Sequence, residues 1–177
     1  VDDKNCLIIQ FINGHSLVNI QKDQKNERIE LNEDEKIAII FQMILIVDYF
    51  HKKRLVYRDL KPDNIIIDEN KNIFIIDFDR LIEINNKSDD QSHTKNFSSP
   101  FVDPFVNSGN ISYSNDIYSI GQMIYFIINE EFPDQQISNE VTIKSENEKI
   151  QQIYKKCHSD KIDERPNISD LMFEFYI

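Results

Sequence analysis

Apolar side chains recur every three to four residues between Asn32 and Arg54, which is the pattern of an amphipathic helix. The apolar positions of this stretch are Ile37, Ile40, Phe41, Ile44 and Val47. Asn32 can cap the helix, and Glu35 stands at the reciprocal position of a capping box. We therefore expect a helix that begins after Asn32 and ends at the cationic residues Lys52–Arg54, where a helix terminus favours positive charge.

The pattern then changes to short runs of β-branched residues. Ile65–Ile67 and Ile73–Ile76 are separated by the polar stretch Asp68–Asn72, which predicts a β-hairpin. Near the N-terminus, Cys6–Ile9 predicts a short buried strand, and Gly14 supplies a turn after it. The chain thus combines a long helix with a small amount of sheet.

The second half of the chain is mainly helical. Ile117–Ile128 is apolar nearly all round, which predicts a central buried helix. We expect it to begin at Ser114 or Asn115 and to end at Pro133. Two shorter helices are predicted further on, over Ile150–Cys157 and Ile168–Tyr176.

Two segments show no sustained period, Asp79–Asn115 and Asp134–Glu148. The first contains Pro100 and Pro104 and is rich in Ser, Asn and Asp. A loop of that length within a domain is either functional or disordered, and the pattern leaves both readings open.

Composition indicates one folded domain without a membrane or nucleic acid as its main partner. The chain has 177 residues, of which 40% are hydrophobic and 29% charged. Its formal net charge of −11 repels phosphate backbones and anionic lipid. The apolar run Ile117–Ile128 is interrupted by polar residues and is too short to span a bilayer.

The cysteines and the N-terminus indicate the compartment. Cys6 and Cys157 are too few for a disulfide scaffold, and no Cys/His cluster has zinc-site spacing. The acidic, polar start is unlike a signal peptide. We expect a cytoplasmic or nuclear protein. Because the chain opens at Val1 rather than Met, we also expect it to be a segment of a longer protein.

Four polar residues around the predicted hairpin have the spacing that phosphoryl transfer from a nucleotide requires. Asp59 can accept the proton of an attacking hydroxyl, and Lys61 can reach the transferring phosphate. Asn64 and Asp77 supply the hard oxygen ligands that Mg²⁺ takes when it also binds phosphates. These residues are the candidate site.

The segment Tyr57-Arg58-Asp59-Leu60-Lys61-Pro62-Asp63-Asn64, followed by Asp77-Phe78-Asp79, resembles the H-R-D-L-K-P-x-N catalytic loop and the D-F-G motif of protein kinases. The Lys two residues after the Asp is the serine/threonine form of that loop. The resemblance implies an α+β, mainly helical fold: a kinase C-terminal lobe with a small β-hairpin over residues 14–177. The last N-lobe strand and the hinge would occupy residues 1–13, and the activation segment residues 77–105.

The resemblance also implies cofactors and partners. ATP and Mg²⁺ would bind, with adenine bonded by hinge backbone groups of Gln10 and Ile12. The partners would be an upstream N-lobe and a protein or peptide substrate. Arg58 would pair with a phosphate on the activation segment, for which Ser88, Ser92 and Thr94 are candidates.

Three further residues take structural or regulatory roles by the same resemblance. Ser98 would replace the Thr that bonds the catalytic Asp. Asp116 would hold the backbone of the catalytic loop. Arg165, in the closing Asp163-Glu164-Arg165-Pro166 stretch, would pair with the Glu of an A-P-E motif.

The chain departs from the kinase pattern in several places. Tyr57 replaces the usual His, as in the active AGC-type kinases. Asp79 replaces the Gly of D-F-G, and Asp tolerates left-handed backbone better than most residues. Phe105 stands in the place of the A-P-E Glu, so Arg165 would need another partner. Glu130 or Glu131 could serve.

The largest departure is the absence of a nucleotide phosphate clamp. With three glycines, Gly14, Gly109 and Gly121, the chain contains no glycine-rich loop, and no strand Lys precedes Leu7. We expect a serine/threonine kinase that is active only in a longer protein. A pseudokinase or scaffold module is the alternative, and a small-molecule kinase is a weaker third reading.

Overall fold

The computed structural model describes residues 10–21, 28–84, 99–105, 111–134, 143–159 and 161–176. These residues form helices and two small sheets. In chain order the elements are β1 His15–Ser16, η1 Leu17–Ile20, α1 Glu33–Lys52, β2 Leu55–Val56, η2 Pro62–Asn64, β3 Ile65–Ile67, β4 Ile73–Ile75, β5 Ile82–Glu83, α2 Tyr113–Asn129, α3 Glu148–Cys157, η5 Ile162–Glu164 and α4 Ile168–Tyr176.

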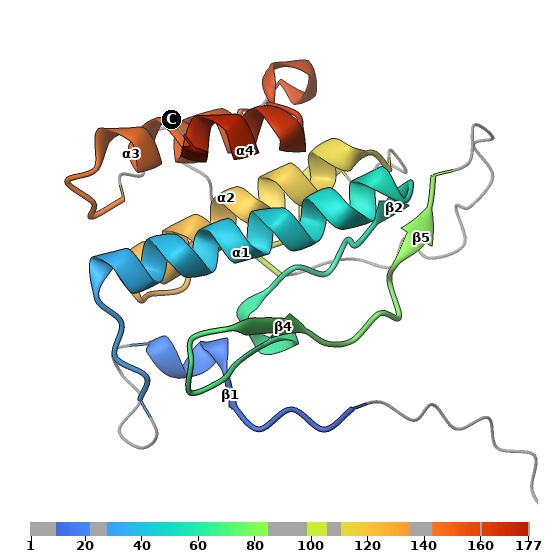
Figure 1. Cartoon of the computed structure of the whole chain (residues 1–177). Coiled ribbons are helices and arrows are strands. Elements are labelled where there is room, and N and C mark those ends of the chain that lie inside the picture. Colours follow the sequence, from blue (N-terminus) through green and yellow to red (C-terminus); the bar gives the residue numbers. More distant parts are fainter. Residues whose placement is uncertain are drawn as a thin grey trace, which may run out of the picture.

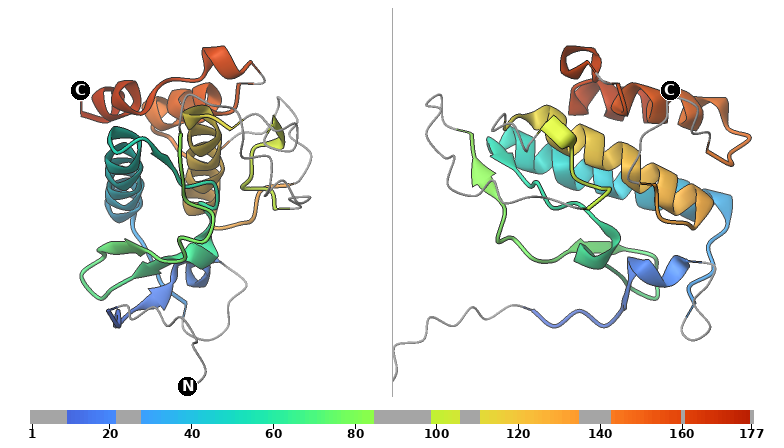
Figure 2. Two further views of the ribbon diagram at one scale, coloured as in Figure 1. Left: turned by 90° about the vertical axis from the view of Figure 1, so that its right-hand side faces the viewer. Right: turned by 180° about the vertical axis from the view of Figure 1, so that it is seen from behind.

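The helices α1 and α2 lie side by side at the centre of the molecule (Figure 1). Helices α3 and α4 cover one side of this pair, and β1, β3 and β4 lie on the opposite side (Figure 2). Side chains from all these layers enter one core, including Ile40, Met43, Ile124 and Leu171. No helix among the described residues is long and apolar enough to cross a membrane.

Helix α1 begins where the sequence predicted. The Asn32 carboxamide oxygen accepts a hydrogen bond from the Glu35 amide at 2.9 Å, and the Glu35 carboxylate accepts one from the Asn32 amide at 2.9 Å. This reciprocal pair satisfies two amides that a helix start leaves unbonded. The helix ends at Lys52, also as predicted.

Helix α2 is buried along nearly its whole length, as predicted, but both of its ends differ from the prediction. It starts at Tyr113 because the Ser112 amide donates to the Asn115 side chain at 2.7 Å, which places the cap two residues earlier. It ends at Asn129, well before Pro133, because Glu130 turns left-handed with a φ of 57°. There the Glu130 carboxylate pairs with Lys36 at 3.0 Å.

The predicted hairpin is confirmed. Strands β3 and β4 pair antiparallel, with Ile66 opposite Phe74, and β1 adds to the other edge of β3. A second sheet, β2 with β5, joins Val56 to Ile82 and was not predicted, because each strand has only two residues and β5 lies within the stretch Asp79–Asn115, which shows no period. The predicted strand Cys6–Ile9 lies outside the described residues.

Candidate active site

Asp116 fixes the loop that carries the candidate site. This carboxylate is fully buried at the start of α2. One oxygen accepts a hydrogen bond from the Arg58 amide at 2.9 Å, and the other accepts one from the Tyr57 amide at 2.9 Å and lies 3.0 Å from His51 Nε2. This is the contact that the kinase resemblance implies for Asp116. It holds Arg58 in a left-handed backbone conformation, with a φ of 66°.

Three of the expected catalytic residues lie together. The Oδ2 atom of Asp59 accepts hydrogen bonds from Lys61 Nζ at 3.0 Å and from Asn64 Nδ2 at 2.8 Å. The same amide nitrogen lies 2.9 Å from the Asp59 carbonyl. Asp59 is only 5% exposed, so its charge is held by these donors rather than by bulk water.

A fourth residue, which the sequence reasoning missed, reaches the same carboxylate. The NH1 atom of Arg80 lies 3.4 Å from Asp59 Oδ1, the oxygen that Lys61 and Asn64 leave to other partners. Arg80 follows directly after Asp79, in the stretch that shows no period, and its proximity to the D-F-x motif was the one available signal.

The backbone places Asp77 beside Asn64. The Ile76 amide donates to the Asn64 carbonyl at 2.9 Å, one residue before Asp77. The Tyr57 hydroxyl lies 2.7 Å from the Ile76 carbonyl and 2.8 Å from the Asp77 carbonyl. Burial and the nearby Asp59 charge raise the pKa of Tyr57, so the phenol remains a donor at neutral pH. Tyr57 thus links the catalytic loop to the D-F-x motif.

The left-handed residue of that motif is Asp77, with a φ of 65°, rather than Asp79. The tolerance of Asp for left-handed backbone therefore matters at Asp77, and the sequence argument placed it at the wrong residue. The Asp79 amide donates to the Asp77 carboxylate at 3.2 Å. Phe78 is 47% exposed and packs edge-on against Phe50 and Tyr57.

The donor set suits Mg²⁺. Both amide hydrogens of Asn64 are directed at Asp59, which leaves the Oδ1 oxygen of Asn64 as the end of the side chain able to bind a cation. Asp77, which directly follows the residue whose amide bonds the Asn64 carbonyl, adds an exposed carboxylate. Within the described residues no group of three or more His, Cys, Asp and Glu is arranged to hold a metal by itself. Two oxygen ligands completed by phosphates and water are a common Mg²⁺ arrangement.

The expected hinge residues lie at the edge of the β1–β3–β4 sheet. Gln10 is exposed and Ile12 half-buried, in an extended stretch before β1. At Gly14 the chain passes so close to β3 that a Cβ would stand 2.4 Å from the Ile67 carbonyl oxygen and 2.8 Å from Ile66 Cγ2. Glycine is therefore required there, and it brings the hinge stretch next to Ile66.

Arg165 has a partner that the sequence reasoning did not identify. Its NH1 atom lies 2.5 Å from Asp103 Oδ2, and both side chains are buried. Asn115 Nδ2 donates to the same oxygen at 2.8 Å, and Arg165 Nε donates to the Ser159 carbonyl at 2.9 Å. The acid that pairs with this Arg thus stands two residues before Phe105, at the first position of the motif that resembles A-P-E.

The two substitutes proposed from the sequence are wrong. Glu130 pairs with Lys36 and Arg28, and Glu131 pairs with Lys144 at 3.0 Å. Segment 99–105 is held on α2 by a further contact, from the Ser119 hydroxyl to the Phe101 carbonyl at 2.7 Å. Ser98 and the candidate phosphosites Ser88, Ser92 and Thr94 lie outside the described residues.

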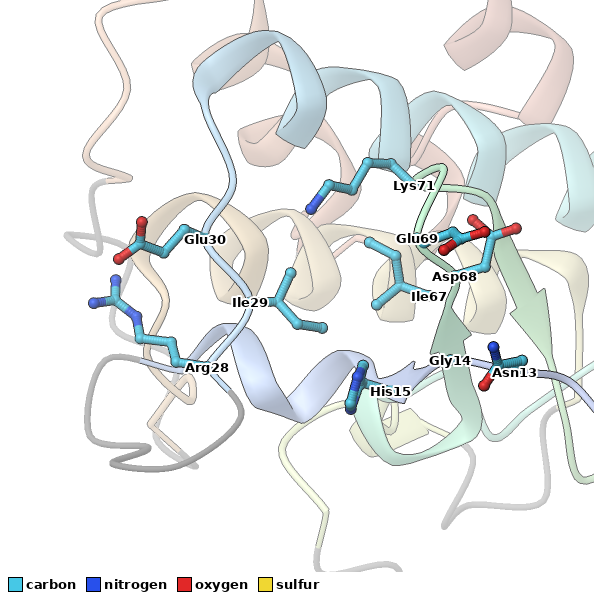
Figure 3. A pocket seen from close by; sticks show the side chains of 10 residues that line it. All are labelled: Asn13, Gly14, His15, Arg28, Ile29, Glu30, Ile67, Asp68, Glu69 and Lys71. Carbon is cyan, nitrogen blue, oxygen red and sulfur yellow. The ribbon is translucent and has the colours of Figure 1, made fainter.

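A cavity of about 430 Å³ lies apart from these residues. It is lined by the stretch around Gly14, by residues 28–30 and by the β3–β4 turn (Figure 3). Ile29 and Ile67 lie between Lys71 and His15 in this view. None of the candidate catalytic or metal-binding residues lines it, so this cavity is separate from the candidate active site.

Comparison with known proteins agrees with this geometry. The family model described as protein kinase domain matches residues 1–176. CBL-interacting protein kinase 21 of Oryza sativa subsp. japonica is 29% identical over 133 residues, which are 73% of this chain and 25% of that protein. Human rhodopsin kinase GRK1 is 29% identical over 126 residues, which are 70% of this chain and 22% of that protein.

The chain therefore spans about a fifth to a quarter of the length of the curated relatives it matches. The match to the family model covers nearly every residue, including the catalytic loop and the D-F-x motif. The chain belongs to the protein kinase family.

Proposed function

We propose that this chain is the C-terminal lobe and hinge of a serine/threonine protein kinase, and that the complete protein transfers the γ-phosphoryl group of ATP to Ser or Thr hydroxyls. Residues 14–177 form the lobe, residues 1–13 the last N-lobe strand and the hinge, and residues 77–105 the activation segment. One observation carries the proposal: Asp59, Lys61 and Asn64 form one hydrogen-bonded cluster, and a backbone bond from Ile76 to Asn64 sets Asp77 beside it.

The cluster supports a division of roles. Asp59 orients the acceptor hydroxyl and takes its proton. Lys61, whose ammonium lies 3.0 Å from Asp59, stabilises negative charge on the transferring group next to the base. Asn64 and Asp77 hold Mg²⁺, which when bound neutralises the charge of the nucleotide phosphates. Catalysis by this lobe is then positioning and electrostatics rather than covalent chemistry.

The nucleotide base belongs on the sheet beside the hinge. Backbone groups of Gln10 and Ile12 are free of regular strand pairing, so they are suited to bond adenine. The close approach at Gly14 brings this stretch to Ile66, whose half-buried side chain offers an apolar floor. An upstream N-lobe would supply the glycine-rich loop and the phosphate-binding Lys. It would also cover exposed aromatic residues such as Phe11, which is 86% exposed.

The alternative is a pseudokinase that serves as an interaction platform. Asp79 in place of Gly is the observation that favours it. The hydrogen-bonded state of Asp59 and the oxygen ligands of Asn64 and Asp77 favour catalysis, because a module without catalysis has no need of them. We expect the protein to act in the cytoplasm or the nucleus.

The proposal is tested by phosphoryl transfer in the full-length protein with Mg²⁺ and ATP. Asp59→Asn should lower kcat by about 100-fold or more, because it removes the base while keeping the shape of the side chain. Asp77→Ala should abolish transfer. Asp63→Asn is the matched control, since Asp63 lies in η2 between these residues and is exposed. Full activity in either site variant would remove the assignment, and an inactive wild type that folds would favour the pseudokinase.

A further inference from the structure

Hydrogen bonds to the backbone at Arg80 and just after it fix the position of this residue. Its carbonyl accepts a hydrogen bond from Arg58 Nε at 2.8 Å. On its C-terminal side β5 begins at Ile82 and pairs with β2, and the Ile84 amide bonds the Arg54 carbonyl at 2.8 Å. The Arg80 side chain therefore starts from a fixed point near the catalytic loop, and its approach to Asp59 is a feature of the fold.

The two oxygens of Asp59 have different partners. Oδ2 takes both the Lys61 and the Asn64 hydrogen bonds, while Oδ1 faces the Arg80 guanidinium at 3.4 Å. Oδ1 is therefore the oxygen with capacity to accept the proton of an acceptor hydroxyl. Arg80 stands at the atom to which that hydroxyl must come.

The Arg80 side chain also faces outward. It is 42% exposed, whereas the Asp59 side chain is 6% exposed. A guanidinium presents its N–H donors in a planar fork that matches two oxygens of a carboxylate or a phosphate in a bidentate pair. Consecutive Cα atoms of a peptide lie about 3.8 Å apart, so the side chain next to a bound acceptor residue lies within reach of this fork.

We propose that Arg80 is a specificity residue, which recognises an anionic side chain, either carboxylate or phosphate, next to the acceptor hydroxyl of a protein substrate. This inference rests on the proposed kinase function. When the anion pairs with the guanidinium, Arg80 turns from Oδ1 of Asp59 and leaves that oxygen to the hydroxyl. Recognition of the substrate and release of the base are thus one event.

The net charge of −11 does not oppose this preference at short range. Exposed charges more than about 8 Å apart are largely screened at physiological salt. Among the described residues, Lys61 and Arg80 are the cations that pair with Asp59, where the acceptor hydroxyl must come. Local pairing therefore decides which residue is preferred next to the acceptor, and the distant acidic surface chiefly affects the rate of encounter.

The preference is measured with the full-length protein and peptides that contain one Ser. The residue next to this Ser is Asp, phosphoserine, Ala or Arg. The Asp and phosphoserine peptides distinguish recognition of a carboxylate from recognition of a phosphate. We expect kcat/KM to be about tenfold higher with at least one of the two anionic neighbours than with Ala. A difference of this size is what one bidentate contact between the guanidinium and the anion can supply. Arg80→Met should bring this ratio close to one, chiefly through KM. Arg80→Glu should move the preference to the Arg neighbour.

Two variants control for fold and charge. Arg80→Lys keeps the charge and should keep part of the preference, because a Lys makes no bidentate pair. Lys71→Met removes one cation from the β3–β4 turn, which lies outside the catalytic loop, and should leave the ratio unchanged. An anionic preference that persists in Arg80→Met, or a wild type that treats all four neighbours alike, would overturn the inference.

Peptide binding without nucleotide separates this inference from the kinase function. The fluorescence anisotropy of the labelled Asp and phosphoserine peptides is measured with wild type and Arg80→Met. Wild type should bind the preferred peptide about tenfold more tightly than the variant. If no peptide is phosphorylated but this difference is seen, the kinase function fails and Arg80 remains an anion-recognising residue. Equal binding by the two proteins overturns the role of Arg80, whatever the activity.

Discussion

Removal of the carboxylate of Asp103 should destabilise the protein more than removal of an exposed acid. Asp103 and Arg165 form an ion pair whose side chains are 0% and 1% exposed. In Asp103→Asn the guanidinium stays buried and loses its counter-charge. Breaking a buried pair in this way costs about 3–5 kcal/mol.

The structure places the expected loss at the lower end of this range. Arg165 keeps its hydrogen bonds to the carbonyls of Ser159 and Ser114, and its guanidinium carbon lies 5.1 Å from the centre of the Tyr118 ring. The new carboxamide still offers one oxygen as acceptor. We therefore expect a loss of about 3 kcal/mol in the free energy of unfolding. At this chain length that corresponds to roughly 6–12 °C in Tm.

Urea unfolding followed by circular dichroism measures this loss as a lower midpoint with an unchanged m-value. Glu131→Gln is the matched control, because its pair with Lys144 is exposed on both sides and should contribute about 1 kcal/mol or less. Asp103→Leu combined with Arg165→Met should recover much of the loss by removing both buried charges. Equal effects of Asp103→Asn and Glu131→Gln would refute the reasoning.

Three further changes test other contacts. Asp116→Ala should cost roughly 2–5 kcal/mol in urea unfolding, because the buried Tyr57 and Arg58 amides lose their acceptor; a loss below 1 kcal/mol would contradict this. Gly14→Ala should lower Tm and weaken ATP binding in the full-length protein, since its Cβ would meet the Ile67 carbonyl at 2.4 Å; unchanged calorimetric binding would remove the hinge assignment. Burial, then the Arg165 charge, lowers the pKa of His158 to about 4. Below pH 6.5 His158 therefore binds a proton in the unfolded chain but stays neutral in the folded protein. The free energy of unfolding should fall as the pH drops from about 6.5 to 4, by roughly 3 kcal/mol at most. His158→Phe, which keeps the ring contacts with Tyr118 and Tyr154, should flatten that slope.

The local pattern predicted the helices because a helix is made of contacts within a few residues. The capping box at Asn32 and Glu35 depends on three neighbouring positions, and it is present as predicted. The end of α2 depends on more than local sequence. Glu130 leaves the helix where its carboxylate meets Lys36 and Arg28, which are about a hundred residues away in the chain. Strand β5 was missed because two residues carry no period, and its partner β2 is far away in sequence.

The sequence by itself determined the family and the candidate chemistry, since Asp59, Lys61 and Asn64 lie within six residues and their order is itself the signal. Only the tertiary structure decided which other residues meet them. It brought Arg80 to the second oxygen of Asp59 and paired Arg165 with Asp103 instead of Glu130 or Glu131. Such contacts join segments that are distant in the sequence, and the local sequence does not say which of these segments will meet. Which partner a buried charge obtains is settled when the layers pack and water is excluded, because a buried charge without a partner is too costly to retain.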